Sequence, residues 1–319
     1  MEKKTGTDLE KETVRDVICR ITKSHLLNGG MIMGQCLTTD GRVRGTIPQM
    51  ENERGIVELP MADVAGGSFA VGVALAGRRP IYVVRFQGFQ WYNAVEIVNY
   101  AAKSKEMWGI PCPLFIRSVG LDGGGGPVAG NAHHGLYYRM PGIDIVAPST
   151  PKEYESAWNH FITHDKPMYV SENRKIWDVT EGLEPLVEAK ADITLFPISS
   201  TRLHAREART KLNEEGVNAN IVDLFWLKPF EATELMKDSL ARSKYGGLVI
   251  DGDYENAASK CIAYELMHAT DKPVYAIGLE ERTAGFAPSL DNVAPTSERI
   301  YSKVFEIIKN YNTTKFLNR

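Results

Sequence analysis

The sequence predicts an α/β protein built from two consecutive three-layer domains with mostly parallel sheets. Two observations lead to this prediction. Short apolar runs alternate with helical segments along the chain, and a polar stretch around 178–188, with Gly182 and Pro185, interrupts the alternation. Such alternation is typical of parallel sheets covered by helices. A chain of 319 residues is long enough for two ordinary domains, which we place at 1–182 and 183–319.

The predicted first domain has strands in short apolar runs and helices between them. A short apolar run bounded by turn residues is typical of a buried strand, whereas apolar residues at helical spacing indicate a helix. We expect strands at 30–33, 80–84, 113–116, 143–146 and 168–170, and helices at 64–76, 92–107 and 151–163.

The predicted second domain repeats this alternation after the polar stretch. Its last segment is an amphipathic helix, which predicts a helix packed on a sheet. We expect strands at 193–198, 219–222, 247–250 and 274–277, and helices at 202–212, 231–240, 256–268 and 297–309.

The composition is that of a globular protein with 43% apolar and 24% charged residues. A net charge of −3 without a basic stripe argues against nucleic-acid binding. No apolar run reaches membrane-spanning length, and the first residues lack the apolar core of a signal peptide. The cysteines form no CxxC pair, so we expect a cytoplasmic protein without disulfides and without a metal site of its own. They are Cys19, Cys36, Cys112 and Cys261.

The segment 58–80 places Asp63 at the start of a predicted helix that leads into a strand. Each glycine in a helix costs about 1 kcal/mol relative to alanine. The many glycines and alanines of this helix therefore indicate close packing against another backbone or a flat cofactor. Free N–H groups and the helix dipole stabilise an acid at this position, so Asp63 can lie near a ligand. A cap on a tightly packed core helix is the alternative.

A series of segments in fixed order is more specific than any of its members. The segments are 13–17, 33–35, 59–80, 89–103, 140–148 and 224–229. Together they resemble the β subunit of the thiamine-diphosphate-dependent 2-oxoacid dehydrogenases, the E1 components of the pyruvate and branched-chain complexes. The resemblance implies a transketolase-like fold, with a pyrimidine-binding domain over 1–182 and a transketolase C-terminal-like domain over 183–319.

The resemblance implies cofactor contacts for three residues. Asp63 stands where the family usually has Glu, whose carboxyl group is hydrogen-bonded to N1′ of the aminopyrimidine of thiamine diphosphate. That contact favours the imino form of the ring, which removes the thiazolium C2 proton, and a raised carboxyl pKa suits this proton sharing. Phe89 aligns with the aromatic residue that stacks on the ring. Gln35 stands where the family often has Glu beside the active-site acid.

Two consecutive histidines, His133 and His134, follow the four glycines at 123–126. They resemble the loop histidine of the family, which implies proton exchange with the substrate or binding of its carboxylate. We favour His134 over His133 as the catalytic residue. A pair of polar loop residues without a catalytic role is the alternative.

A second acidic motif consists of Asp251 and Asp253, with Asn256 nearby. Its order and spacing differ from those of the family's Mg²⁺ and diphosphate motif, so we interpret it as a turn with a helix cap. The resemblance therefore implies that Mg²⁺ and the diphosphate are held by an α-type partner subunit. It also implies self-association of the β subunits, giving a heterotetramer of two α and two β subunits.

The leading functional hypothesis is a β-type subunit of a heteromeric thiamine-diphosphate enzyme. This enzyme would decarboxylate a small-molecule 2-oxoacid and transfer the acyl or aldehyde group, and would be active only with its α-type partner. One alternative is the C-terminal half of a split transketolase-like carboligase acting on a sugar phosphate. The other is a non-catalytic scaffold subunit.

Overall fold

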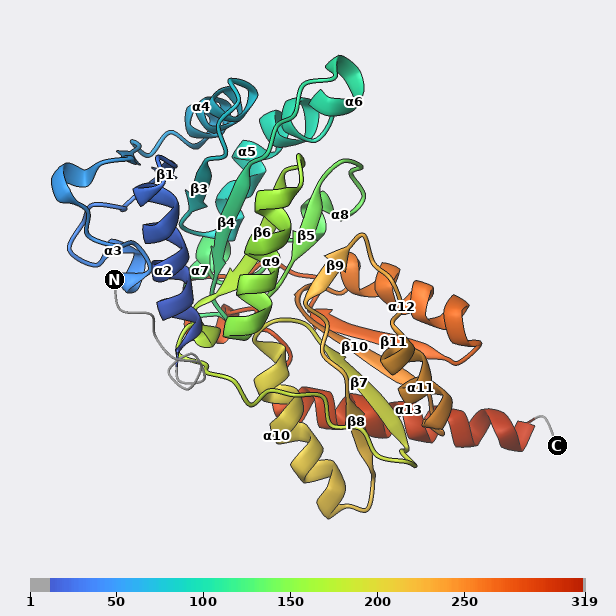
Figure 1. Cartoon of the computed structure of the whole chain (residues 1–319). Coiled ribbons are helices and arrows are strands. Elements are labelled where there is room, and N and C mark those ends of the chain that lie inside the picture. Colours follow the sequence, from blue (N-terminus) through green and yellow to red (C-terminus); the bar gives the residue numbers. More distant parts are fainter. Residues whose placement is uncertain (1–11, 318–319) are drawn as a thin grey trace.

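A parallel sheet with helices on both faces forms the centre of the N-terminal domain in the computed structural model, which describes residues 12–317 and side chains through 313 (Figure 1). Within these residues the sheet has seven strands in the order β2-β1-β3-β4-β6-β5-β9. All neighbours run parallel except β5 and β9. The strands are β1 (Ile32–Gly34), β2 (Ile56–Glu58), β3 (Ile81–Val84), β4 (Phe115–Gly120), β5 (Asp144–Val146), β6 (Met168–Asn173) and β9 (Trp226–Lys228).

Two helices, α2 (Val14–Leu27) and α9 (Pro151–Thr163), cover one face of this sheet. Each begins with a capping box, formed by Thr13 and Asp16 in α2 and by Thr150 and Glu153 in α9. Their apolar faces pack on strands of the sheet to form one of the hydrophobic cores.

The other face is covered by α4 (Asp63–Leu75) and by the segment that begins with α5 (Gln90–Glu96). The predicted helix over 92–107 is not continuous. It divides into α5, a π-helical stretch η3 (Ile97–Ala101) and α6 (Ser104–Trp108). A π turn holds one more residue than an α turn, so it shifts the faces that follow. Short helices complete the domain: α3 (Arg42–Gly45), η1 (Glu51–Glu53), η2 (Gln87–Phe89), α7 (Gly126–Ala129), α8 (Gly135–Tyr138) and η4 (Arg174–Ile176).

The described part of the C-terminal domain has a four-stranded parallel sheet in the order β11-β10-β7-β8. Helices α10 and α13 pack on one face, and α11 and α12 pack on the other (Figure 1). The elements are β7 (Ile193–Pro197), α10 (Thr201–Glu214), β8 (Ala219–Ile221), α11 (Glu234–Arg242), β10 (Gly247–Tyr254), α12 (Ala258–Thr270), β11 (Val274–Leu279), η5 (Pro288–Leu290) and α13 (Ser297–Leu317). The predicted fold class, two consecutive α/β domains with mostly parallel sheets, is confirmed.

The two domains share a core. Strand β9 lies beyond the polar stretch in sequence, yet it pairs antiparallel with β5 of the N-terminal sheet. Arg202 of α10 also forms an ion pair with Glu153 of α9. Because these contacts cross the boundary at 182, the C-terminal domain is held against the edge of the first sheet.

Among the described residues, no helix is both long and apolar enough to span a bilayer. The same residues contain no group of three or more His, Cys, Asp or Glu side chains that could hold a metal ion.

Candidate active site

Asp63 is the first residue of α4 and lies at the carboxyl end of the N-terminal sheet. Helix α4 follows β2, and Gln35 follows the neighbouring strand β1. Because parallel strands end at the same edge, these two side chains meet: Gln35 Nε2 donates to Asp63 Oδ1 over 3.1 Å. This edge is where α/β sheets commonly bind ligands. The structure thus brings together two of the residues assigned to the cofactor.

The carboxyl group of Asp63 is partly exposed and electrostatically perturbed. Burial raises its pKa above the ordinary value, and the hydrogen bond from Gln35 only partly offsets this. The charge of Asp63 in turn contributes to the raised pKa of Tyr82, mainly an effect of burial, so Tyr82 is near Asp63. A carboxyl group of this kind holds a proton more readily than one in water and can share it with a weakly basic nitrogen.

Glu58 organises the segment that follows Gln35. Its carboxylate accepts hydrogen bonds from the backbone N–H groups of Cys36, Leu37 and Thr38, over 2.5, 2.7 and 2.8 Å. Three such bonds to one anion hold the chain firmly at this position. Glu58 therefore positions the residues around Gln35.

Phe89 is the last residue of η2 and is half-buried. Its ring centroid lies 6.3 Å from that of Phe86 and 6.5 Å from that of Tyr92. The side chain of Asn93 donates to the Phe89 carbonyl over 3.1 Å and accepts from the Tyr82 hydroxyl over 3.0 Å. Asn93 thereby connects Phe89 to the tyrosine beside Asp63.

Two glycines allow α4 to approach this network. A Cβ at Gly66 would lie 3.1 Å from the Tyr82 hydroxyl, and one at Gly67 would lie 2.4 Å from Asn93 Oδ1. These glycines therefore permit close packing on protein atoms, one of the two explanations that the sequence offers. Gly72 has no such neighbour within 4 Å.

The two histidines lie in different environments. His134 is 1% exposed, with Nε2 3.0 Å from Asp251 Oδ2 and Nδ1 3.2 Å from Ser171 Oγ. Burial alone would lower its pKa, but the Asp251 carboxylate outweighs this and the pKa is raised to about 9. Burial, together with the charge of His134, lowers the pKa of His133 to about 4. His134 is thus a cation and His133 a neutral imidazole at neutral pH.

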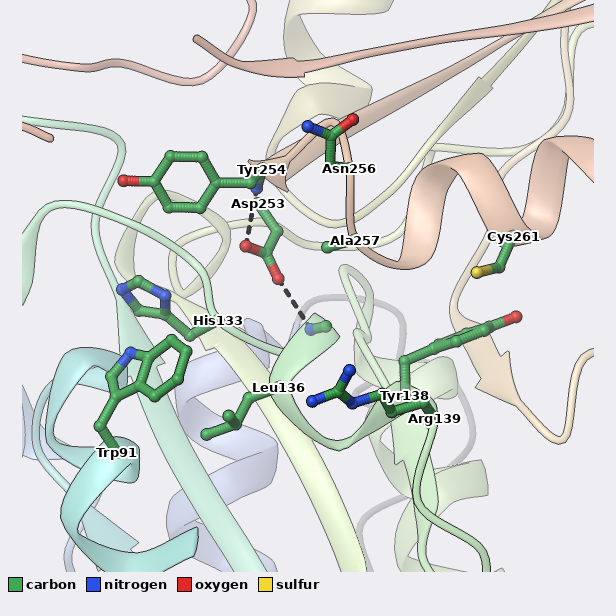
Figure 2. Close-up of a pocket in the computed structure, with 11 residues that line it drawn as sticks. Trp91, His133, Leu136, Tyr138, Arg139, Asp253, Tyr254, Asn256, Ala257 and Cys261 are labelled. Atoms are coloured by element: carbon green, nitrogen blue, oxygen red, sulfur yellow. Dashed lines mark hydrogen bonds between the residues drawn. The ribbon is translucent and has the colours of Figure 1, made fainter. Parts of the chain in front are cut away.

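Residues of α5, α8 and α12 line a cavity between the domains (Figure 2). Its volume is about 300 Å³. The ring of His133 lines it, 6.2 Å from the ring of Trp91 and 6.4 Å from that of Tyr254. His134 does not line this cavity. The ring of His133, 7% exposed, therefore faces this cavity, whereas His134, which the sequence analysis favours as the catalytic residue, is enclosed.

The acidic pair Asp251 and Asp253 is not a turn with a helix cap, so that prediction is wrong. Both residues lie in the last half of β10 and are buried. Asp253 accepts hydrogen bonds from the backbone N–H groups of Gly135 and Tyr254, each over 2.7 Å (Figure 2). Burial raises the pKa of Asp253 to about 6, although the charge of His134 opposes the shift. These acids connect β10 to the N-terminal domain, Asp251 through His134 in the loop before α8 and Asp253 through the first residue of α8.

The two domains, with Asp63 at the carboxyl edge of the first sheet, identify the class of protein. Residues 33–178 match the family model of the transketolase pyrimidine-binding domain, and residues 183–300 match that of the transketolase C-terminal domain. A solved structure described as a split-gene transketolase, an inactive β4 tetramer, has the same fold. It superimposes with a TM-score of 0.68 at 17% identity, covering 93% of this chain and 98% of that one.

Within that class the relatives are more specific. Over 288 residues the chain is 27% identical to the pyruvate dehydrogenase E1 component subunit beta of Rickettsia felis, covering 83% of this chain and 86% of the relative. It is 25% identical to the 2-oxoisovalerate dehydrogenase subunit beta of Bacillus subtilis, covering 81% and 82%. The chain thus consists of the two domains of the transketolase family, and the resemblance seen in its sequence is confirmed by its similarity to these E1 β subunits.

Proposed function

We propose that this chain is the β-type subunit of a heteromeric thiamine-diphosphate enzyme that decarboxylates a 2-oxoacid and transfers the resulting acyl or aldehyde group. The observation that carries the proposal is the Asp63 carboxyl group at the carboxyl edge of a pyrimidine-binding domain, with a raised pKa and Gln35 on one oxygen. A partly exposed acid in this state fits the aminopyrimidine end of the coenzyme. Phe89 supplies an aromatic ring at the same edge of the sheet.

The residues of this chain would hold and orient one end of the coenzyme. Thiamine diphosphate, when bound, supplies the carbon nucleophile that attacks the 2-oxo carbonyl. Asp63 would hold a proton at the N1′ atom of the ring, and Gln35 keeps its carboxyl group in place. His133, neutral at pH 7, would exchange a proton with the substrate. His134 would hold the His133 loop through its ion pair with Asp251.

An α-type partner is part of the proposal. Among residues 12–317 no acidic cluster could hold Mg²⁺, so we assign the metal and the diphosphate to the partner. Helices α4, α5 and α6 and the segments beside them also carry large exposed apolar side chains, a surface that favours protein contact. These are Met61, Val64, Phe69, Trp91, Tyr92, Val95, Tyr100, Met107 and Trp108. We propose that they contact the α-type subunit in a cytoplasmic heterotetramer of two α and two β subunits.

A reconstitution experiment tests the proposal. The chain, its α-type partner and their mixture are each titrated with thiamine diphosphate and Mg²⁺, and binding is followed by calorimetry. We expect tight binding and turnover of a 2-oxoacid, measured with an artificial electron acceptor, only in the mixture. Tight binding by this chain alone, or by the partner alone with full turnover, would contradict the proposed division of labour.

The split carboligase remains the second candidate because of one observation at the edge of the sheet where Asp63 lies. Arg85, after β3, and Arg174, after β6, form no ion pair with a carboxylate among the described residues, and Arg174 Nε is buried there without a hydrogen-bond partner. Unpaired cations suit a phosphorylated substrate better than a simple 2-oxoacid. Turnover of a sugar phosphate without release of CO₂ by the reconstituted mixture would favour this candidate.

A further inference from the structure

One buried side chain, that of Gln87, contacts the loop that carries His133. Gln87 is the first residue of η2, two residues before Phe89, and is 1% exposed. Its Oε1 atom accepts a hydrogen bond from the backbone N–H group of His133 over 2.7 Å. A single short turn therefore carries both the ring of Phe89 and the group that holds the His133 loop.

The amide group of Gln87 uses both its donor and its acceptor side. Oε1 also accepts from the Tyr169 hydroxyl over 3.0 Å. Nε2 donates to one carbonyl oxygen in each of β4 and β6, both over 3.2 Å, and to Ser171 Oγ over 2.9 Å. A carboxylate would place an oxygen against the two carbonyl oxygens, and an apolar side chain would leave the His133 N–H group without an acceptor. These surroundings therefore favour glutamine at position 87.

The second histidine is connected to the same amide. Ser171 Oγ, which accepts from Gln87, lies 3.2 Å from His134 Nδ1. The other ring nitrogen of His134 faces Asp251 of the C-terminal domain. The two histidines are thus held by Gln87 from one domain and by Asp251 from the other. Hydrogen bonds of this kind fix the orientation of a neighbouring functional side chain.

Close packing of η2 on the segment before His133 adds to this restraint. A Cβ at Gly88 would lie 2.3 Å from the carbonyl oxygen of Val128 in α7. A Cβ at Gly120, the last residue of β4, would lie 3.2 Å from Gln87 Nε2. The turn and the loop therefore meet backbone to backbone, with the Gln87 amide between the loop and the strand ends.

The imidazole of His133 depends on this backbone for its direction. Its Nε2 atom is buried and has no hydrogen-bond partner among the described residues. The ring has only the aromatic contacts to Trp91 and Tyr254 described above. Because an unpartnered nitrogen is free to bind a ligand, its position relative to that ligand is set by the hydrogen bonds of the loop.

We propose that Gln87 is a positioning residue, which holds the His133 loop on the turn that carries Phe89 and so fixes the imidazole relative to the ring at the Asp63 edge. A displacement of about 1 Å at a reacting group can cost about 10²-fold in rate. The restraint on the loop rests on the hydrogen bonds of Gln87 alone. Its effect on turnover rests on the function proposed for His133.

The first test follows the protonation of His133 in the full-length chain without coenzyme or partner. NMR of the histidine ring protons at pH 6 reports it, and His133→Asn identifies the signal. Burial and the charge of His134 lower the pKa of His133 to about 4, so the wild-type ring is neutral at pH 6. In Gln87→Met the freed loop admits water, and we expect the pKa to rise toward the ordinary 6.5 and the ring to be partly protonated. The other titratable groups lining the cavity are identical in both proteins: Tyr138, Arg139, Asp253, Tyr254 and Cys261.

Tyr169→Phe is the matched control. It removes a buried hydrogen bond to the same Oε1 atom but leaves the bond from the His133 N–H group. We expect a loss of stability in this variant, with the His133 ring still neutral at pH 6. Gln87→Asn keeps a buried amide that is one methylene too short to reach the loop. It should protonate like Gln87→Met, and it replaces that variant if the methionine prevents folding.

The second test measures turnover of the mixture reconstituted with the α-type partner. We expect kcat to fall by about ten- to a hundredfold in Gln87→Met, with a smaller change in KM, because the imidazole is present but misplaced. In Tyr169→Phe kcat should stay within about twofold of the wild-type value.

Different outcomes contradict the two proposals. A ring that stays neutral at pH 6 in both Gln87 variants, or that is protonated equally in Tyr169→Phe, would overturn the positioning role. Full turnover in the Gln87 variants, with turnover lost in His133→Asn, would overturn it as well. Protonation in the Gln87 variants with full turnover in them and in His133→Asn would instead contradict the function proposed for His133, and would leave Gln87 as the residue that holds the loop.

Discussion

His134 Nε2 lies 3.0 Å from Asp251 Oδ2, with both side chains no more than 1% exposed, and this ion pair joins the two domains. His134 belongs to the loop after β4, and Asp251 belongs to β10. The neighbouring acid, Asp253, accepts from the backbone of Gly135. The contact fixes the loop that carries His133 against the C-terminal domain.

This pair predicts a pH dependence of stability. The pKa of His134 is raised from 6.5 to about 9 in the folded state. Because the pKa is higher in the folded state, protonation of His134 stabilises the fold fully at pH values below its pKa in the unfolded state. This stabilisation is lost as the pH rises through its pKa in the folded state. We expect roughly 3 kcal/mol to be lost between pH 6.5 and 9. Urea unfolding of the wild type and Asp251→Asn at several pH values measures this, and identical slopes for both proteins in that window would refute it.

The role proposed for Asp63 predicts how its substitution changes the turnover of the reconstituted enzyme. Asp63→Asn retains the shape but cannot hold and release a proton, so kcat should fall by about 10²–10⁴-fold. Asp63→Glu, which restores the residue usual in the family, should retain substantial activity. Asp40→Asn, at an exposed position, is the control. Unchanged turnover in Asp63→Asn would favour the scaffold hypothesis.

Glu58 predicts a loss of stability and of coenzyme binding together. Removing its carboxylate leaves three backbone N–H groups without their acceptor. Glu58→Ala should lower the free energy of unfolding by about 1–3 kcal/mol and weaken coenzyme binding through displacement of Gln35. The exposed Glu51→Ala serves as control. If Glu58→Ala were as stable as the wild type in urea unfolding, the segment after Gln35 would not depend on the Glu58 carboxylate for its conformation.

The surroundings of two glycines in α4 predict that a change to alanine destabilises the protein at one position and stabilises it at the other. A Cβ at Gly67 would lie 2.4 Å from Asn93 Oδ1, so Gly67→Ala must displace the side chain that accepts from Tyr82. We expect a loss of about 1–3 kcal/mol. Gly72→Ala meets open space in the same helix and should stabilise by up to about 1 kcal/mol. Chemical denaturation measures both, and a similar sign in the two variants would count against the packing argument.

The exposed apolar surface predicts a variant defective only in assembly. Val95 is 57% exposed on α5, so Val95→Ser should change the stability of the chain by no more than about 0.5 kcal/mol. Its association with the α-type subunit should weaken by at least about 1 kcal/mol. Leu27→Ser is the control, because Leu27 is 67% exposed at the end of α2 on the opposite face of the sheet. Sedimentation of the mixtures measures association, and equal weakening by both variants would exclude a specific contact at Val95.

Most strands and helices could be predicted from local pattern. The helix at Pro151–Thr163 agrees at both ends, because its capping box and first proline mark its start. The helix predicted over 92–107 failed at its centre, because apolar spacing does not distinguish an α turn from a π turn. Strand β9, three residues long, gave no periodic signal, and pairing with β5 defines it.

The sequence by itself determined the fold class, the family and the place of Asp63 at the start of a helix. These depend on residue order and on interactions between near neighbours. The tertiary structure alone decided that His133 faces the cavity while His134 is enclosed, that Asp251 is the partner of His134, and that Arg85 and Arg174 lie over the same ring, that of Phe86. Such juxtapositions depend on which strand ends meet at one edge of a sheet, and no local pattern records that.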